Sequence, residues 1–310
     1  MEEKSNMKAL VIGYGSIGKR HARLLNDLSC RVAVLSRRPI EFSPHYFDLS
    51  QALDNWQPEY VVVANRTNEH LQTIETLSKQ GFKGRLLIEK PLFDQFMPFP
   101  ENKFSLVAVA YNLRHHRMMR KLKNLLNEAT ELISVSVYVG SYLPDWRTES
   151  DYRHSYSARK QEGGGVLRDL SHELDYVLWL FGPWRWMTAA GGHLSSLEID
   201  SDDIFSLLLA TDRCPLVSIH MNYLDRMPCR KILVNTNNDT ICVDLIKNIF
   251  HINGIQETVC VGRDDTYVIQ HQAMLNGNLD GLCTIGEAIE TLNTIDVAEK
   301  SAMSHKWIER

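Results

Sequence analysis

One lysine, Lys90, is a candidate for proton transfer because of its position in the sequence. Lys90 lies between Glu89 and Pro91, directly after the apolar run 85–88, which is typical of a buried strand. A lysine at the carboxyl end of a strand, aimed into a crevice and partly desolvated, can exchange protons and stabilise negative charge. The alternative is an exposed lysine paired with Glu89, because most lysines lie at the surface.

A histidine in the second half of the chain has a similar potential. Residues 166–180 have the period of a helix that begins after Gly163–Gly165 and carries one apolar stripe. Three titratable side chains fall on the opposite side at i, i+3 and i+6: Asp169, His172 and Asp175. Two large aromatic residues share that side and indicate the wall of a cleft: Tyr176 and Trp179. Histidine is suited to proton transfer near neutral pH, whereas a solvated helix face is the alternative.

The elements that position these groups begin near the N-terminus. The apolar run 9–12 predicts a strand, and helical spacing begins at Ile17. Between them lies a G-x-G-x-x-G pattern, in which the first glycine permits a tight turn, the second a close pyrophosphate and the third close helix packing. The pattern predicts that a dinucleotide binds here, and the alternative is a glycine-rich turn in another α/β protein. The candidate residues are Gly13, Tyr14, Gly15, Ser16, Ile17 and Gly18.

The end of the second strand, 31–35, bears on which dinucleotide binds. An acid about 20 residues after the glycines would bind the ribose hydroxyl of NAD, whereas an arginine accommodates the phosphate of NADP. The sequence has Ser36, Arg37 and Arg38 at this place. These residues predict NADP, with NAD as the alternative. The alternative to a cofactor contact is that Arg37 and Arg38 are solvated residues of a turn.

Further strands at 60–64, 85–88 and 104–110 alternate with helical segments, which predicts a parallel, doubly wound sheet. Ligands bind such sheets beyond the carboxyl ends of the strands, so the turns there should face one crevice. Besides Glu89 and Lys90, the residues expected to contact the cofactor are Asn65, Arg66, Thr67 and His70. Those expected to contact the substrate are Asn112 and Arg114.

The second half of the chain predicts a mostly antiparallel sheet, because short loops join its strands. The expected strands are 132–139, 204–210, 216–221, 231–235, 240–244 and 258–261, with a closing helix at 286–301. An aromatic and polar segment at 142–160 suits a sugar-like ligand, although an ordinary surface loop is equally compatible. Its candidate residues are Trp146, Arg147, Tyr152, Arg153 and Tyr156. We expect two domains, residues 1–114 and 115–310.

Composition limits the partners. The formal net charge of −4 over 310 residues, without a long basic block, argues against nucleic acid. No apolar run has the length of a membrane span, and the first residues lack the apolar core of a signal peptide. The six cysteines are scattered without a Cys-x-x-Cys pair, which favours reduced thiols in the cytoplasm and predicts no metal site.

In this ordered set of motifs the chain resembles the glucose–fructose oxidoreductase/inositol dehydrogenase (Gfo/Idh/MocA) family. The resemblance rests on segments 13–18, 65–70, 89–91, 111–114 and 163–169. It implies an N-terminal Rossmann domain and a C-terminal α+β domain whose open sheet forms a homodimer or homotetramer. It also implies that Lys90, His172 and the Asp169 carboxylate surround the reacting carbon beside the nicotinamide. Family members often space this acid and histidine four residues apart rather than three, so Asp175 could instead orient His172.

The expected activity is that of an NAD(P)-dependent oxidoreductase. Hydride would pass between the nicotinamide and a secondary alcohol or ketone of a sugar derivative. Segment 143–165 is similar to a subgroup found with bacterial surface-sugar biosynthesis. The first alternative is a lyase or epimerase that oxidises its substrate transiently on a retained cofactor. The second is an inactive dinucleotide-binding sensor.

Overall fold

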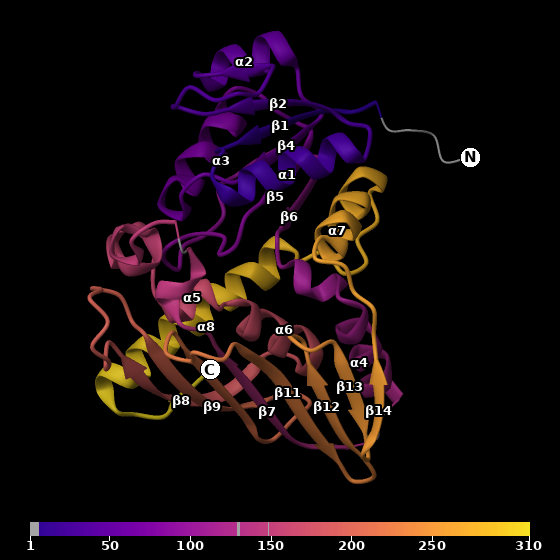
Figure 1. Ribbon diagram of the computed structural model, residues 1–310, viewed down its shortest axis with the longest axis vertical. Coiled ribbons are helices and arrows are strands. Elements are labelled where there is room, and N and C mark those ends of the chain that lie inside the picture. The colour runs from indigo at the N-terminus through magenta and orange to yellow at the C-terminus, as the bar shows by residue number, and fades with distance from the viewer. Residues whose placement is uncertain (1–5, 129–130, 148) are drawn as a thin grey trace. The chain divides into compact units, whose positions relative to one another are not determined.

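The computed structural model describes residues 6–128, 131–147 and 149–310 (Figure 1). The chain forms two compact units. The first holds the chain up to Phe93, then Met97–His115 and Arg263–Ile289, and the second holds Asp94–Phe96, His116–Gly262 and Glu290–Arg310. The domain boundary expected after residue 114 stays a prediction, and this division adds the return of residues 263–289 to the first unit.

A parallel sheet forms the first unit, and it confirms the predicted Rossmann fold. The strand order is β3-β2-β1-β4-β5-β6, which is the order of dinucleotide-binding folds. The central strands are continuous apolar runs because helices cover both faces of such a sheet. The strands are β1 Lys8–Ile12, β2 Arg31–Leu35, β3 His45–Tyr46, β4 Tyr60–Val63, β5 Arg85–Ile88 and β6 Leu106–Val109.

The helices of the first unit include two that the sequence did not predict, α2 and α7. Helix α7 contacts α1 and the turn η2, and Figure 1 shows it in orange. Its buried side chains are largely polar, namely Thr266, Gln270 and His271, so it lacks an apolar stripe. The helices are α1 Ser16–Asp27, α2 Leu49–Trp56, α3 His70–Lys79 and α7 Asp265–Asn276, with 3-10 turns η1 Thr67–Glu69 and η2 Asn112–His115.

The second unit is built on a mixed, mostly antiparallel sheet, as expected. The strand order is β14-β13-β12-β11-β7-β10-β9-β8-β15. Among the described residues of this sheet, β7 and β10 are the only neighbouring strands that run parallel. The strand expected at 258–261 was wrong, because the chain forms a hairpin at 249–258 instead, and β8 was missed. The strands are β7 Leu132–Gly140, β8 Trp184–Gly192, β9 Ile204–Thr211, β10 Val217–Asn222, β11 Cys229–Thr236, β12 Thr240–Asp244, β13 Ile249–Ile252, β14 Ile255–Thr258 and β15 Ile308–Glu309.

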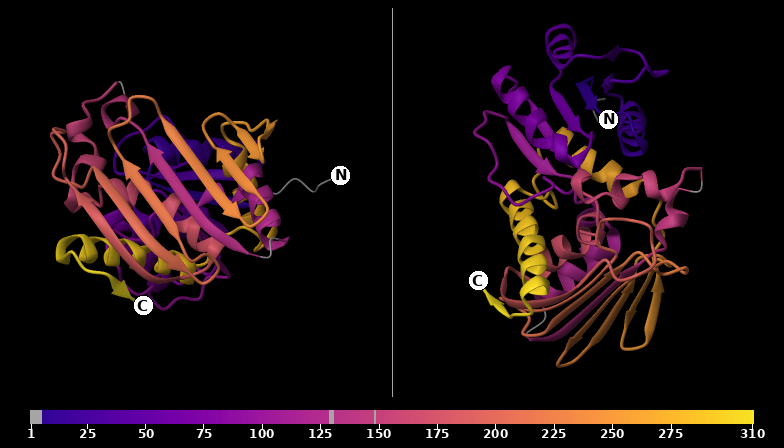
Figure 2. Two further views of the ribbon diagram at one scale, coloured as in Figure 1. Left: turned by 90° about the horizontal axis from the view of Figure 1, so that it is seen from below. Right: turned by 90° about the vertical axis from the view of Figure 1, so that its left-hand side faces the viewer.

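Helices pack on one face of this sheet, and Figure 2 shows the strands of the other face side by side in the open. Strand β7 alternates accordingly, with Val137 buried and Tyr138 exposed. The helices are α4 Arg117–Glu128, α5 Val166–Asp169, α6 His172–Phe181 and α8 Ile285–Ser304. Four 3-10 turns precede α5: η3 Leu143–Trp146, η4 Tyr152–His154, η5 Tyr156–Ala158 and η6 Lys160–Glu162. No helix in the described part of the chain is long and apolar enough to cross a membrane.

Candidate functional site

The glycine turn between β1 and α1 has the geometry that the motif predicts. Gly13 adopts φ +96°, and a Cβ there would lie 2.5 Å from the Ala64 carbonyl oxygen. A Cβ on Gly18 would lie 2.0 Å from the Gly13 carbonyl oxygen, so this glycine allows α1 to pack close to β1. A Cβ on Gly15 would meet nothing within 4 Å. The first and third glycines are therefore required by the protein itself, whereas the second leaves open space.

That open space lies at the start of α1. Gly15 is the N-cap residue, with extended φ −75° and ψ −168°, and no side chain caps the helix there. The first turn of α1 contains no acidic residue, and Gly15 and Ser16 are exposed. An uncapped helix N-terminus offers N–H donors and a partial positive charge to an anion. These features fit the pyrophosphate of a dinucleotide.

The end of β2 carries the two arginines expected to contact the adenosine ribose. Both Arg37 and Arg38 are exposed, and Arg37 donates to Glu69 Oε1 at 3.0 Å. The Ser36 hydroxyl accepts from the Arg38 backbone N–H at 3.2 Å and donates to the Arg38 carbonyl oxygen at 3.1 Å. A ribose phosphate would therefore compete with the Glu69 carboxylate for the Arg37 guanidinium.

The turn after β4 contains two buried polar atoms that stand out among the described residues. Asn65 uses its amide nitrogen to donate to Glu69 and Thr73, while its Oδ1 is buried and has no hydrogen-bond partner in the described chain. His70 Nδ1 lies 3.0 Å from the Leu92 carbonyl oxygen, and its buried Nε2 likewise has no such partner there. Burial lowers the pKa of His70, so its ring is neutral. Arg66 is exposed, and Thr67 is half-buried.

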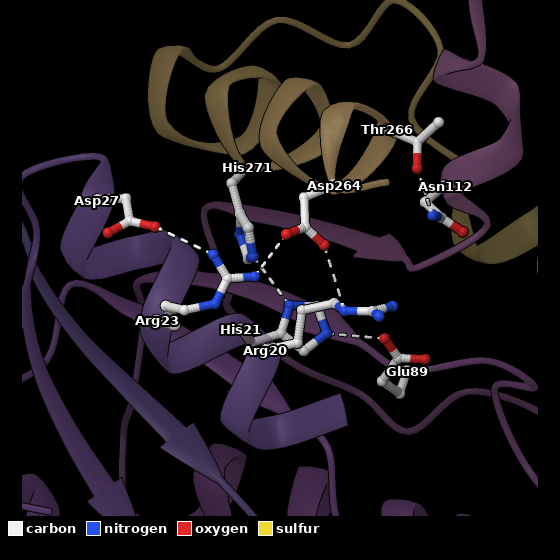
Figure 3. A network of polar contacts seen from close by, with 9 residues as sticks. All are labelled: Arg20, His21, Arg23, Asp27, Glu89, Asn112, Asp264, Thr266 and His271. Carbon is white, nitrogen blue, oxygen red and sulfur yellow. Dashed lines mark hydrogen bonds and ion pairs between the residues drawn. The ribbon is translucent and has the colours of Figure 1, made fainter. Parts of the chain in front are cut away.

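Lys90 follows β5 in a half-buried position, and the carboxylate before it is buried. Glu89 Oε2 accepts from the Lys90 backbone N–H at 3.1 Å, and Oε1 lies 2.7 Å from Nε2 of His21 on α1 (Figure 3). His21 was not among the residues that the sequence singled out, since no local pattern links it to a residue 68 positions away.

The two residues expected to bind substrate after β6 are both buried. Asn112 donates to the Thr266 hydroxyl on α7 at 2.7 Å (Figure 3). Arg114 is 1% exposed and donates to Glu287 Oε1 at 2.9 Å. These contacts bind η2 to the later part of the first unit. A substrate contact for either residue stays a prediction.

In the second unit, the three glycines form a strained turn before α5. Gly165 adopts φ +118°, and a Cβ on it would lie 2.2 Å from Asp202 Oδ1. Asp202 in turn accepts from the Leu167 backbone N–H at 3.0 Å, which holds the first turn of α5. The predicted helix 166–180 was therefore wrong in one respect. It is two helices, α5 and α6, separated by Leu170 and Ser171.

Asp169 lies at the end of α5 among aromatic hydroxyls. Tyr223 Oη donates to Asp169 Oδ2 at 2.7 Å, and Trp146 packs edge-on against the Tyr223 ring. The negative charge of Asp169, together with burial, raises the pKa of Tyr156. Burial and the same carboxylate raise the pKa of Tyr223. Both phenols are therefore neutral donors near Asp169.

His172 is the first residue of α6 and is half-buried. On the side of α6 opposite its apolar stripe, Asp175 is 1% and Tyr176 0% exposed, whereas His172 and Trp179 are half-buried. A fully solvated helix face is therefore wrong, and the cleft wall stays a prediction. That side is filled by polar contacts inside the unit, where Glu173 forms an ion pair with Arg230 at 2.8 Å. The assignment of Asp169 or Asp175 as the partner of His172 stays a prediction.

The aromatic and polar segment before α5 is ordered by its own contacts. Trp146 donates to Ser141 at 2.6 Å, and the Arg147 guanidinium lies over the Tyr156 ring at 5.5 Å. The Tyr152 hydroxyl accepts from the Glu198 backbone N–H, and Arg153 pairs with Asp151 and Glu198. Contacts of these residues with a substrate stay predictions. In the described residues, no group of three His, Cys, Asp or Glu side chains is placed to hold a metal ion.

Comparison with known proteins identifies the family. A model described as an oxidoreductase family with an NAD-binding Rossmann fold matches residues 7–110, and the GFO/IDH/MocA C-terminal domain matches residues 119–240. The chain belongs to the GFO/IDH/MocA family. The family confirms the predicted resemblance and the oxidoreductase class of this GFO/IDH/MocA protein. No curated protein matches the chain at a significant level.

Solved structures similar to this GFO/IDH/MocA protein share its fold. GenD2 from gentamicin A biosynthesis, in complex with NAD, is 20% identical with a TM-score of 0.81, covering 98% of this chain and 96% of its own. Levoglucosan dehydrogenase in complex with NADH is 15% identical with a TM-score of 0.85, covering 98% and 99%. The WlbA dehydrogenase from Bordetella pertussis, in complex with NADH and UDP-GlcNAcA, is 17% identical with a TM-score of 0.80 and the same coverage.

Proposed function

We propose that this protein is a cytoplasmic dehydrogenase or reductase that transfers hydride between NAD(P) and a secondary alcohol or ketone of a sugar derivative. One observation carries the proposal. The ends of β1, β4 and β5 are in register through Ile12, Val63 and Ile88. Two strand spacings, about 10 Å, therefore separate the open glycine turn after Ile12 from the end of β5, which leads to Lys90. A dinucleotide turn and a candidate acid–base group thus share one edge of one sheet.

The roles of the chain's own residues follow from their chemistry. The uncapped N-terminus of α1 binds the pyrophosphate through N–H donors. When bound, the nicotinamide supplies or accepts the hydride. The Lys90 ammonium stabilises negative charge on the substrate oxygen, and His172 or Lys90 exchanges the proton of its hydroxyl.

The cofactor preference that we propose is for NADP(H), with NAD(H) as the alternative. Ser36 stands where an acid would bind the ribose hydroxyl, and Arg37 and Arg38 are exposed beside it. A ribose phosphate would take the Arg37 guanidinium from Glu69, forming a charge-assisted contact in place of a surface ion pair. The similar structures contain NAD or NADH, so the alternative has its own support.

The substrate class that we propose is a sugar or a nucleotide-linked sugar, used in bacterial surface-sugar biosynthesis. Trp146, Tyr152 and Tyr156 provide rings for stacking, while Arg147 and Arg153 provide charged donors. The names of levoglucosan dehydrogenase and of the WlbA complex with UDP-GlcNAcA support this class.

The decisive experiment combines a substrate screen with variants at Lys90. Ligands that co-purify with the protein are identified by mass spectrometry, and related sugars are assayed with NAD⁺ and NADP⁺ by reduced-nicotinamide absorbance. Lys90→Met should abolish turnover and leave cofactor affinity within a few fold, because the pyrophosphate is held by the glycine turn. Lys103→Met, at an exposed lysine of the same unit, is the matched control and should behave as the unmodified protein.

Different outcomes of the same assay favour the other functions. Substrate consumption without net change in absorbance would indicate a lyase or epimerase that retains its cofactor. Cofactor binding without consumption of any substrate would indicate a sensor. Near-normal turnover by Lys90→Met on the identified substrate would refute the catalytic role of this residue.

We also propose that two copies of the chain, or four, assemble through the open face of the second unit's sheet. This face exposes Ile133, Tyr138 and Leu233, which a partner would cover. Leu233→Asp should shift the molar mass measured by light scattering toward the monomer. Leu194→Asp, at an exposed leucine outside the strands, should leave the mass unchanged.

A further inference from the structure

Four buried side chains, three from different elements and one directly after β5, form a continuous chain of hydrogen bonds in the first unit. Tyr60 Oη on β4 lies 2.9 Å from His271 Nδ1 on α7, and His271 Nε2 lies 2.8 Å from His21 Nδ1 on α1. His21 Nε2 then lies 2.7 Å from Glu89 Oε1. Figure 3 shows the last three of these residues between α1, α7 and the end of β5. Both histidines and Tyr60 are 0% exposed, and Glu89 is 9% exposed.

The direction of this chain follows from its first member. Within the described residues, the Tyr60 hydroxyl has one hydrogen-bond partner, which is His271 Nδ1. Burial raises the pKa of Tyr60, so the hydroxyl keeps its proton and must donate it. Burial also lowers the pKa of His271, which is therefore neutral. Since Nδ1 of His271 accepts, its proton is on Nε2, and this nitrogen donates to His21 Nδ1.

The direction of the hydrogen bond between His21 and the Glu89 carboxylate follows in the same way. Nδ1 of His21 accepts, so the ring carries its proton on Nε2 and donates to Glu89 Oε1. The other oxygen of Glu89 accepts from the Lys90 backbone N–H. Both carboxyl oxygens of Glu89 therefore act as acceptors in this chain. Every donor in the chain meets an acceptor, and the chain ends at the backbone of Lys90.

We infer that His21 is a positioning residue for Lys90. It holds the Glu89 carboxylate against the Lys90 backbone N–H, while Tyr60 and His271 fix the proton on the required ring nitrogen. This inference rests on the proposed role of Lys90 in catalysis. It gives α7, from the late part of the sequence, a part in setting the conformation at the end of β5.

Two substitutions at position 21 separate the two hydrogen bonds of the ring. The amide nitrogen of glutamine corresponds in position to Nε2 and can still donate to Glu89. The amide oxygen of asparagine corresponds to Nδ1 and can still accept from His271, but asparagine does not reach Glu89. Both replace the buried ring by a neutral amide, so each variant is the control for the other in polarity, and the melting temperature reports the cost of the smaller asparagine.

The expected result is a split between the two variants. His21→Gln should keep kcat within about threefold, whereas His21→Asn should lower kcat about 10- to 100-fold because Lys90 is displaced. The cofactor dissociation constant should change by no more than a few fold in either variant. Equal activity of both variants would overturn the inference. A loss of activity in both, in step with the melting temperature, would assign His21 a structural role instead and would likewise overturn it.

Measurements that do not depend on turnover separate this inference from the proposed function. Amide hydrogen exchange at Lys90 should be faster in His21→Asn than in His21→Gln, whatever reaction the protein catalyses. Nitrogen-15 shifts of the histidine rings should show His21 and His271 both protonated at Nε2. An Nδ1-protonated ring at either position, or equal exchange at Lys90, would refute the chain as described. Normal turnover of Lys90→Met would instead refute the proposed catalytic role of Lys90 and leave these readouts intact.

Discussion

Replacing Gly15 by serine should make the protein more stable and weaken its binding of the cofactor. Gly15 is the N-cap of α1, its φ and ψ are those of an ordinary N-cap residue, and a Cβ there would meet nothing within 4 Å. Serine is a better N-cap than glycine by a few tenths of a kcal/mol. It also restricts the unfolded chain, which is worth about 0.4–1 kcal/mol. We therefore expect an increase of about 0.5–1 kcal/mol in the free energy of unfolding.

Gly15→Ser should also remove the free N–H donor and the open space that a bound pyrophosphate would use. The serine hydroxyl would accept from an N–H of the first turn of α1, and its Cβ would occupy the space that Gly15 leaves open. A hydrogen bond to a charged group contributes about 1.5–3 kcal/mol. Losing one such bond weakens binding roughly 10- to 100-fold.

Thermal unfolding and fluorescence titration with NADH and NADPH provide the assay. The melting temperature of Gly15→Ser should rise by about 1–4 °C while both dissociation constants increase. Gly18→Ala is the control, because its Cβ would lie 2.0 Å from the Gly13 carbonyl oxygen and should lower stability and binding together. A stabilised Gly15→Ser protein with unchanged cofactor affinity would show that the turn does not bind the pyrophosphate.

Three further predictions concern other parts of the chain. The protein should bind NADPH roughly tenfold more tightly than NADH, and Arg37→Ala combined with Arg38→Ala should remove the difference; equal affinities in the unmodified protein would contradict this. His172→Ala should lower kcat by about 10²–10⁴-fold and remove one limb of the pH dependence of kcat/KM near neutrality, without a comparable drop in melting temperature. Burial raises the pKa of Glu287, but the Arg114 charge and hydrogen bonds from Thr284 lower it by a larger amount. The net pKa of Glu287 therefore lies below the usual 4.5. Its contribution to stability is therefore present above about pH 4.5 and lost as the pH falls through the lower value. Glu287→Gln should cost about 1–2 kcal/mol near neutral pH, a figure reduced because the side chain is 40% exposed, and urea titrations should show this difference shrink as the pH falls below 4.5.

The sequence predicted the parts of the fold that local patterns determine. The run 9–12 followed by spaced glycines predicted strand, turn and helix correctly, because the apolar run, the glycine spacing and the change to helical period all lie within about 20 residues of one another. Strand β8 and the hairpin at 249–258 were missed, since Trp184–Gly192 ends in small residues and β14 is exposed at every position. Helix α7 was missed because its buried face is polar, and its partners lie far away in the sequence.

The candidate site shows the same division. Lys90 and Glu89 could be singled out from their place after a strand, but the link from Glu89 to His21 spans 68 residues. The link from His21 to His271 spans 250 residues. The helical wheel correctly placed the apolar stripe of 166–180, yet it could not show that Asp175 and Tyr176 on the other side are also buried. When a helix is buried on two sides, the spacing of polar and apolar residues does not show that the polar side is buried as well.

The return of residues 263–289 to the first unit has a consequence for synthesis of the protein on the ribosome. The N-terminal sheet emerges early, but its buried Tyr60 and His21 lack their partner until His271 has been made. At ordinary rates of translation, roughly ten to thirty seconds separate residue 115 from residue 271. During that interval the nascent chain exposes the surface of α1 and η2 that α7 later covers. A fragment that ends after residue 115 would remain in this state, because the unit whose translation begins first is not complete until residue 289, after most of the second unit has been made.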